Sequence, residues 1–162
     1  MVSVEAVARG ASPSAQVRAV APRGSFRVTS SGGSTVIDPA SFQRYDGLVR
    51  MVEDLEPEAL ARIYGRLKPR LDEAFAELGV PGTFDDAMTR ALRHLLDTPE
   101  LPASARVQTV KGINYAYVDP AFEDLSSAQR QLLRLGPERS AKVKEHLRRF
   151  GVALGIPPDR LQ

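Results

Sequence analysis

The chain has 162 residues, with 22 Lys and Arg against 20 Asp and Glu, 43% hydrophobic residues and no cysteine. This composition is typical of one globular domain, and it excludes a disulfide scaffold, a thiolate nucleophile and a thiolate metal site. The net charge of +2 gives little general attraction for nucleic acid or for a membrane surface, so we expect neither as a partner.

The first residues differ from the rest in composition. Residues 1–24 combine Ala, Val, Ser, Arg and Pro without a sustained period, which predicts a flexible linker. Charged residues interrupt each of its apolar runs, so the segment does not have the pattern of a signal peptide. Residues 25–155 are predicted to form a single compact domain, and residues 156–162, which begin with Ile-Pro-Pro, are predicted to form a tail.

Two pairs of β-prone runs predict hairpins. Residues 26–29 and 35–37 flank a Ser/Gly turn whose glycines can adopt a positive φ angle. Residues 106–110 and 113–118 flank Lys111-Gly112 in the same way. The first turn does not match a phosphate-binding loop, because a strand follows the glycines instead of a lysine and a helix. We therefore expect a small antiparallel sheet formed from one or two hairpins.

Helix signals occupy most of the remaining sequence. Six starts carry a capping side chain, or a proline at the first position, where the missing amide hydrogen would have no partner. They are Asp38-Pro39, Glu56-Pro57, Thr83, Asp119-Pro120, Ser126 with Gln129, and Gly136-Pro137. Pro69 interrupts the second apolar stripe and predicts a kink near residues 65–69. The predicted fold class is therefore α+β, mainly α-helical, with five or six helices packed against the small sheet.

Four separated blocks of the sequence resemble a known family. They are residues 37–46 (IDPASFQRYD), 83–87 (TFDDA), 114–120 (NYAYVDP) and 128–138 (AQRQLLRLGPE). In this order they are similar to a bacterial domain-of-unknown-function family, number three thousand and fourteen, and the resemblance covers residues 26–153.

The resemblance implies a cellular location but no activity. Members of that family usually have an N-terminal transmembrane helix, a Pro/Ala-rich linker and then this domain, which implies an envelope protein whose domain faces the periplasm. Residues 1–24 resemble the linker alone, without the anchor. We therefore expect the periplasmic side of the cell envelope, with the cytoplasm as the alternative, and contact with the membrane only through such an anchor. The resemblance implies no cofactor and no catalytic residue.

The titratable residues form no recognisable catalytic or metal-binding motif. Asp85 and Asp86 fall in the first turn of the helix that Thr83 caps, where acidic side chains interact favourably with the helix dipole. His94 and His146 each lie beside an apolar helical stripe, and neither has the spacing of a Ser–His–Asp or His–Glu motif. We expect no metal and no cofactor.

Two groups of residues are candidates for an interaction surface. Tyr115 and Tyr117 alternate along a strand and so share one face, where they can pack on the core or contact a partner chain. Arg139, Lys142 and Arg149 share one side of the last helix at 100° per residue. A solvated helix face is the ordinary explanation for such basic residues, and contact with a partner is the functional one.

These features favour a non-enzymatic protein-interaction module of the bacterial cell envelope, whose partner is another envelope protein. The first alternative is an enzyme whose dispersed residues converge in a deep pocket. Those residues are Asp46, Asp86, His94 and Tyr115. The second alternative is an anion- or nucleic-acid-binding module, which requires Arg134, Lys142 and Arg149 to lie together on one surface.

Overall fold

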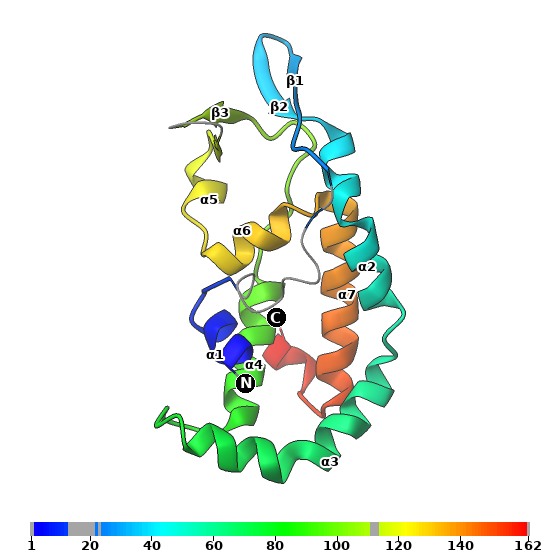
Figure 1. The fold of residues 1–162 in the computed structure, drawn as a ribbon, viewed down its shortest axis with the longest axis vertical. Helices are drawn as coiled ribbons and strands as arrows, with labels where there is room; N and C mark the ends of the chain where they lie inside the picture. The colour runs from blue at the N-terminus through cyan, green and yellow to red at the C-terminus, as the bar shows by residue number, and fades with distance from the viewer. Residues whose placement is uncertain (1, 13–21, 23, 111–113, 162) are drawn as a thin grey trace.

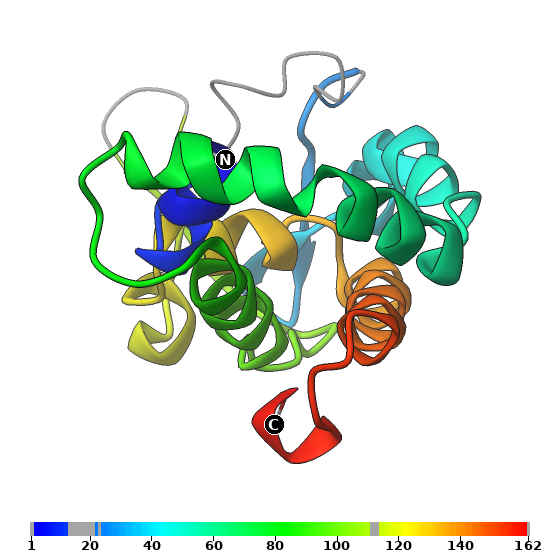
Figure 2. The ribbon, with the colours of Figure 1, turned by 90° about the horizontal axis from the view of Figure 1, so that it is seen from below.

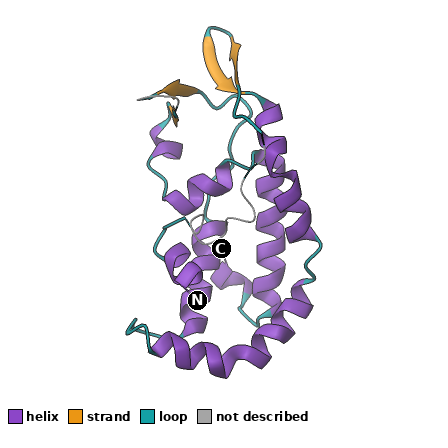
Figure 3. Ribbon diagram, viewed as in Figure 1, coloured by secondary structure: helices purple, strands orange, loops and turns teal. Residues whose placement is uncertain are grey.

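The computed structural model describes residues 2–12, 22, 24–110 and 114–161. It confirms the predicted class, an α+β fold that is mainly helical, with two small antiparallel hairpins at one end (Figures 1 and 3). The elements in chain order are α1 (Val2–Ala8), β1 (Val28–Ser31), β2 (Ser34–Ile37), the 3₁₀ helix η3 (Pro39–Tyr45), α2 (Asp46–Glu53), α3 (Pro57–Ala76), α4 (Phe84–Leu96), β3 (Val107–Thr109), β4 (Tyr115–Tyr117), α5 (Pro120–Glu123), α6 (Ser127–Leu133), α7 (Pro137–Ala153) and the 3₁₀ helix η4 (Pro158–Leu161).

Each of the six predicted helix starts opens a helix of the structure. The side chain of Asp38 accepts a hydrogen bond from the amide of Ala40 at 2.8 Å, and η3 begins at Pro39. Capping boxes start both α4 and α6, at Thr83 and Ser126 respectively. In each box the cap and the third helical residue exchange hydrogen bonds, which satisfies two amides that lack partners inside the helix.

Both predicted hairpins are present, and each forms its own two-stranded sheet. In β1–β2 the register runs from Val28 opposite Ile37 to the tight turn at Gly32 and Gly33, whose φ angles are +57° and +77°. Two positive φ angles suit the turn to the twist of the strands. A bridge between Val36 and Arg106 links the two hairpins. The second turn lies outside the described residues.

The lower part of the molecule is a group of helices around α7. This helix contacts α2, α3 and α4, and η4 lies against both α4 and α7 (Figure 2). Leu161 of η4 is 1% exposed and packs with Leu92 and Leu96. The prediction of a tail over residues 156–162 is therefore wrong for η4, because Leu161 belongs to the core.

The N-terminal segment also differs from the prediction. Val2–Ala8 form α1, which packs against α4, so the prediction of a linker is wrong for these residues. Val7 is buried with Ala91 and Ala128, and the Glu5 carboxylate forms an ion pair with Arg90 at 3.6 Å. The predicted linker residues 13–21 and 23 lie outside the described part of the chain.

The long helix α3 continues through Pro69. Figure 1 shows α3 curving around the lower end of the molecule. Proline removes one backbone hydrogen bond from a helix and so permits it to bend.

Candidate functional site

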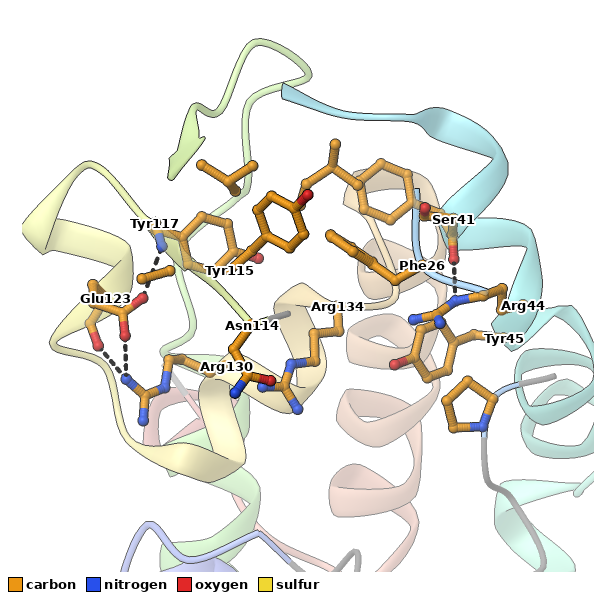
Figure 4. A pocket seen from close by; sticks show the side chains of 15 residues that line it. Phe26, Ser41, Arg44, Tyr45, Asn114, Tyr115, Tyr117, Glu123, Arg130 and Arg134 are labelled. Carbon is orange, nitrogen blue, oxygen red and sulfur yellow. Dashed lines mark hydrogen bonds and ion pairs between the residues drawn. The ribbon is translucent and has the colours of Figure 1, made fainter. Parts of the chain in front are cut away.

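A pocket of about 440 Å³ lies between the two hairpins and the helices that follow them (Figure 4). Residues of the two hairpin regions, which the Val36–Arg106 bridge links, form its walls. Residues of η3 and α6 form its inner end. The aromatic residues that line it are Phe26, Phe42, Tyr45, Tyr115 and Tyr117. The pocket therefore joins segments that are distant in the sequence.

The aromatic side chains divide into an exposed rim and a buried floor. At the rim, Phe26 and Tyr115 are each 38% exposed, and their rings lie 5.3 Å apart. At the floor, Tyr45 is 3% exposed and Tyr117 is 9% exposed. Tyr117 packs against Phe122 of α5 with its ring 5.9 Å away. The rim is thus open to an apolar group from outside, while the floor is part of the core.

Three arginines and one glutamate supply the charges of the pocket. Arg130 pairs with Glu123 at 3.0 Å, and the other oxygen of that carboxylate accepts a hydrogen bond from the amide of Tyr117 at 2.8 Å. Arg44 lies over the rings of Phe26 and Tyr45, at 5.5 Å and 5.6 Å from their centroids. These contacts hold both cations in place by ion pairing and cation–π attraction.

Arg134 is the third cation of the pocket. It is exposed, and its Nη1 atom donates a hydrogen bond to the Oε1 atom of Gln131 at 3.1 Å. Within residues 24–110 and 114–161, no acidic side chain forms an ion pair with Arg134. Its guanidinium group is therefore available to an anion that enters the pocket.

Burial raises the pKa of Tyr117 to about 12, and the nearby Glu123 carboxylate acts in the same direction against the opposing effect of Arg134. Its hydroxyl group is thus protonated at neutral pH and can donate a hydrogen bond. No hydrogen bond from this hydroxyl, or from that of Tyr45, is formed to another described residue. Both phenols are therefore free to serve a bound group.

The predicted interaction residues separate into two places. Tyr115 and Tyr117 both line the pocket, together with Ala116 between them on β4. Arg139, Lys142 and Arg149 instead face α2 and α3, where each forms an ion pair with an acidic residue of those helices. The pairs are Arg139 with Asp46 at 2.5 Å, Lys142 with Glu53 at 3.1 Å and Arg149 with Glu58 at 4.0 Å. Each of these three cations therefore already has an acidic partner within the chain.

The residues of the two alternative functions do not meet. Asp46 pairs with Arg139, while Asp86 belongs to the capping box of α4, where hydrogen bonds from Thr83 lower its pKa. Of the four residues of the enzyme alternative, Tyr115 alone lines the aromatic pocket. Arg134 also lines the pocket, whereas Lys142 and Arg149 contact other helices, so the cluster that an anion-binding helix requires is not formed.

A serine–histidine contact is present that the sequence spacing does not reveal. The Nε2 atom of His94 lies 2.6 Å from the hydroxyl of Ser126, which also accepts the amide of Gln129 as the cap of α6. A Cβ atom on Gly10 would lie 3.3 Å from the same imidazole nitrogen, so the chain after α1 covers this contact. The pair joins α4 to α6 beneath α1, and it does not line the aromatic pocket.

A second polar cluster joins α3 to α4. Asp85 accepts hydrogen bonds from the hydroxyl of Tyr64 and from Lys68, whose ammonium group also contacts Asp72 at 3.0 Å. Burial and Asp85 raise the pKa of Tyr64, and hydrogen bonds to Asp85 and Asp72 raise that of Lys68. Burial opposes ionisation of Asp85, but Lys68 and Tyr64 outweigh it and lower its pKa. None of these shifts produces a base that titrates near neutral pH.

The described part of the chain lacks two features that would point to other functions. It contains no group of three or more His, Asp or Glu side chains arranged to hold a metal ion. None of its helices combines the length and the apolar character needed to cross a membrane.

Comparisons with known proteins identify one family. A family model described as "Protein of unknown function (DUF3014)" matches residues 1–151. No curated protein matches the chain, and no solved structure does.

Proposed function

We propose that this chain, which belongs to the family described as Protein of unknown function (DUF3014), is a non-enzymatic interaction module that binds a segment of another protein in its aromatic pocket. One observation carries the proposal. The pocket combines an exposed aromatic rim, formed by Phe26 and Tyr115, with an arginine that has no acidic partner in the described chain. Aromatic residues and arginine are enriched at protein interfaces and in their energetic hot spots.

The proposed setting is the bacterial cell envelope, with another envelope protein as the partner. The family membership supports it, because the resemblance implies a domain held on a linker outside the inner membrane. Protease treatment of cells with an opened outer membrane tests this location in the native host. We expect degradation of the protein only after the outer membrane is opened. Protection until the inner membrane is lysed would contradict the envelope location.

Site-specific crosslinking in cells tests the binding function. A photoreactive phenylalanine analogue replaces Tyr115 at the rim, and the same analogue at Leu78 serves as the control. Leu78 is similarly exposed but does not line the pocket. We expect a discrete crosslinked product from position 115 and none from position 78. The proposal fails if position 115 yields no discrete product, or if both positions yield the same products.

A further inference from the structure

Hydrogen-bond donors line the inner part of the aromatic pocket. Figure 4 shows Tyr45 and Tyr117 on opposite sides of the pocket with Arg134 between them, its guanidinium group beside the side chain of Asn114. Arg134 and both phenols line this one pocket. A guanidinium group and two phenols offer donors at this floor, and donors of this kind suit an anionic oxygen.

The charge balance of the lining also favours an anion. Its charged residues are three arginines and Glu123, and Arg130 already neutralises that glutamate. Arg44 is held by two aromatic rings and donates to the carbonyl oxygen of Ser41 at 3.0 Å. Arg134, whose hydrogen bond goes to the neutral amide of Gln131, is thus the cation that a ligand can engage.

The rim above this floor favours a ligand that has an apolar group next to its anionic group. Phe26 and Tyr115 come from different hairpin regions and form a tilted ring pair that is open to solvent. A pocket of about 440 Å³ accommodates a few side chains of an extended peptide. The anionic group and the apolar group of the ligand must therefore be adjacent, because the floor and the rim belong to one pocket.

We propose that the pocket recognises an aspartate or glutamate side chain in an extended segment of the partner protein, with Arg134, Tyr45 and Tyr117 donating to its carboxylate and an adjacent apolar side chain packing on Phe26 and Tyr115. This inference rests on the proposed interaction function and specifies the chemistry of the partner. Charge complementarity selects the acidic residue, and the aromatic rim selects its neighbour.

Blocked peptides test this recognition by titration calorimetry on the full chain. The first probe is acetyl-Ala-Ala-Phe-Asp-Phe-Ala-amide, and the second carries Asn in place of Asp. We expect the Asp peptide to bind about 10-fold more tightly than the Asn peptide, because a charge-assisted pair with a guanidinium group is lost on amidation. We also expect added salt to weaken binding of the Asp peptide alone.

Substitution of Arg134 identifies the group that reads the carboxylate. Arg134→Gln should remove the difference between the two peptides and leave the affinity for the Asn peptide unchanged. Arg70→Gln is the matched control, because Arg70 is an exposed helical arginine outside the pocket. It should leave the 10-fold preference intact. Both side chains are exposed, and an unchanged thermal midpoint establishes that each variant is folded.

The outcomes separate this inference from the proposed function. Equal affinity for the Asp and Asn peptides, or no binding of either, overturns the recognition of an acidic side chain. A third peptide carries Asn in place of Asp and ends after its last Phe with a free C-terminal carboxylate. If this peptide binds most tightly of the three, the recognition of an acidic side chain is overturned. In each of these cases, a discrete crosslinked product from position 115 would still support the proposed interaction function. If that product is absent as well, both the inference and the proposed function are rejected.

Discussion

Gly136 connects α6 to α7 with a φ angle of +83°, a conformation that residues with a side chain rarely adopt. A Cβ atom at this position would lie 2.5 Å from the Cγ atom of Phe42, whose side chain packs against the core near the hairpins. We predict that Gly136→Ala lowers the free energy of unfolding by about 2–4 kcal/mol, from backbone strain and overpacking together. Urea denaturation of the two proteins measures this loss.

Gly79 provides the matched control for this prediction. It also has a positive φ angle, +64°, but a Cβ atom there meets no other heavy atom within 4 Å. Gly79→Ala should therefore cost only the backbone strain, roughly 1 kcal/mol. Equal losses in the two variants would show that the contact with Phe42 has no role.

Tyr117 makes the stability of the protein depend on pH in the alkaline range. Burial raises its pKa from 10.0 to about 12, so the folded state holds the phenolic proton more tightly than the unfolded state. Its contribution is complete below pH 10 and is lost as the pH rises through 12. We predict a decrease of roughly 1.4 kcal/mol per pH unit in the free energy of unfolding between these values.

Tyr117→Phe isolates this effect, because it removes the ionisable hydroxyl and keeps the ring in the core. The difference in the free energy of unfolding between wild type and variant should be constant below pH 10. Between pH 10 and pH 12, the free energy of unfolding of the wild type should fall relative to that of the variant. Tyr64, whose pKa is also raised, is present in both proteins and cancels. A constant difference at all pH values would contradict the assignment.

At the scale of elements, α7 is held to α2 and α3 by ion pairs as well as by packing. Arg139 and Asp46 form the shortest of these pairs, and the arginine side chain is only 21% exposed. We predict a coupling energy of about 1 kcal/mol from a double-mutant cycle with Arg139→Met and Asp46→Ala. This coupling energy should decrease at high salt, because screening weakens the attraction.

The control cycle uses Arg148 and Glu145, which lie three residues apart on α7. Both side chains are largely exposed, so their coupling energy should be about 0.3 kcal/mol. If this exposed pair couples as strongly as Arg139 with Asp46, the link between α7 and α2 has no special contribution to stability.

The elements that could be predicted from the sequence are those with local signals. Thr83 and Ser126 start α4 and α6 because a cap satisfies amide groups within its own helix. By contrast, Val2–Ala8 is a segment of seven residues, mostly Val and Ala, and its helix is stabilised by contacts of Val7 with α4 and α6. Such long-range packing leaves no periodic pattern in so short a segment, which explains why the linker prediction failed there.

At the scale of the whole molecule, Leu161, the last described residue, packs into the core between α4 and α7. Leu161 is almost fully buried, and its Cδ1 atom would lie 2.7 Å from a Cβ atom on Gly151. We predict that Leu161→Ala lowers the free energy of unfolding by about 2–4 kcal/mol, because it leaves a cavity beside Leu92. Thermal or urea unfolding measures this loss.

Val152 serves as the comparison for Leu161. It lies on the neighbouring helix α7 and is 49% exposed. Val152→Ala should change the free energy of unfolding by less than about 0.5 kcal/mol. A small effect at both positions would mean that η4 is not part of the cooperative core.

The candidate site could be predicted only in part. The alternation of Tyr115 and Tyr117 places them on one face of a strand, and both line the pocket. Arg134 and Phe26 reach the same pocket from other segments, and no spacing along the chain relates them to β4. Helical periodicity predicts that Arg139 shares one side of the last helix with Lys142 and Arg149, but it cannot reveal the carboxylate of α2 with which Arg139 pairs.

The assembly of the pocket from remote segments has a practical consequence. Phe26 precedes the first hairpin, while Tyr115 begins β4 and Arg134 follows α6. A peptide that contacts all three of these residues therefore binds only to molecules in which both hairpins and the end of α6 are correctly folded. The stoichiometry of a saturating titration thus serves as an assay of the properly assembled fraction in any preparation, without a separate structural probe.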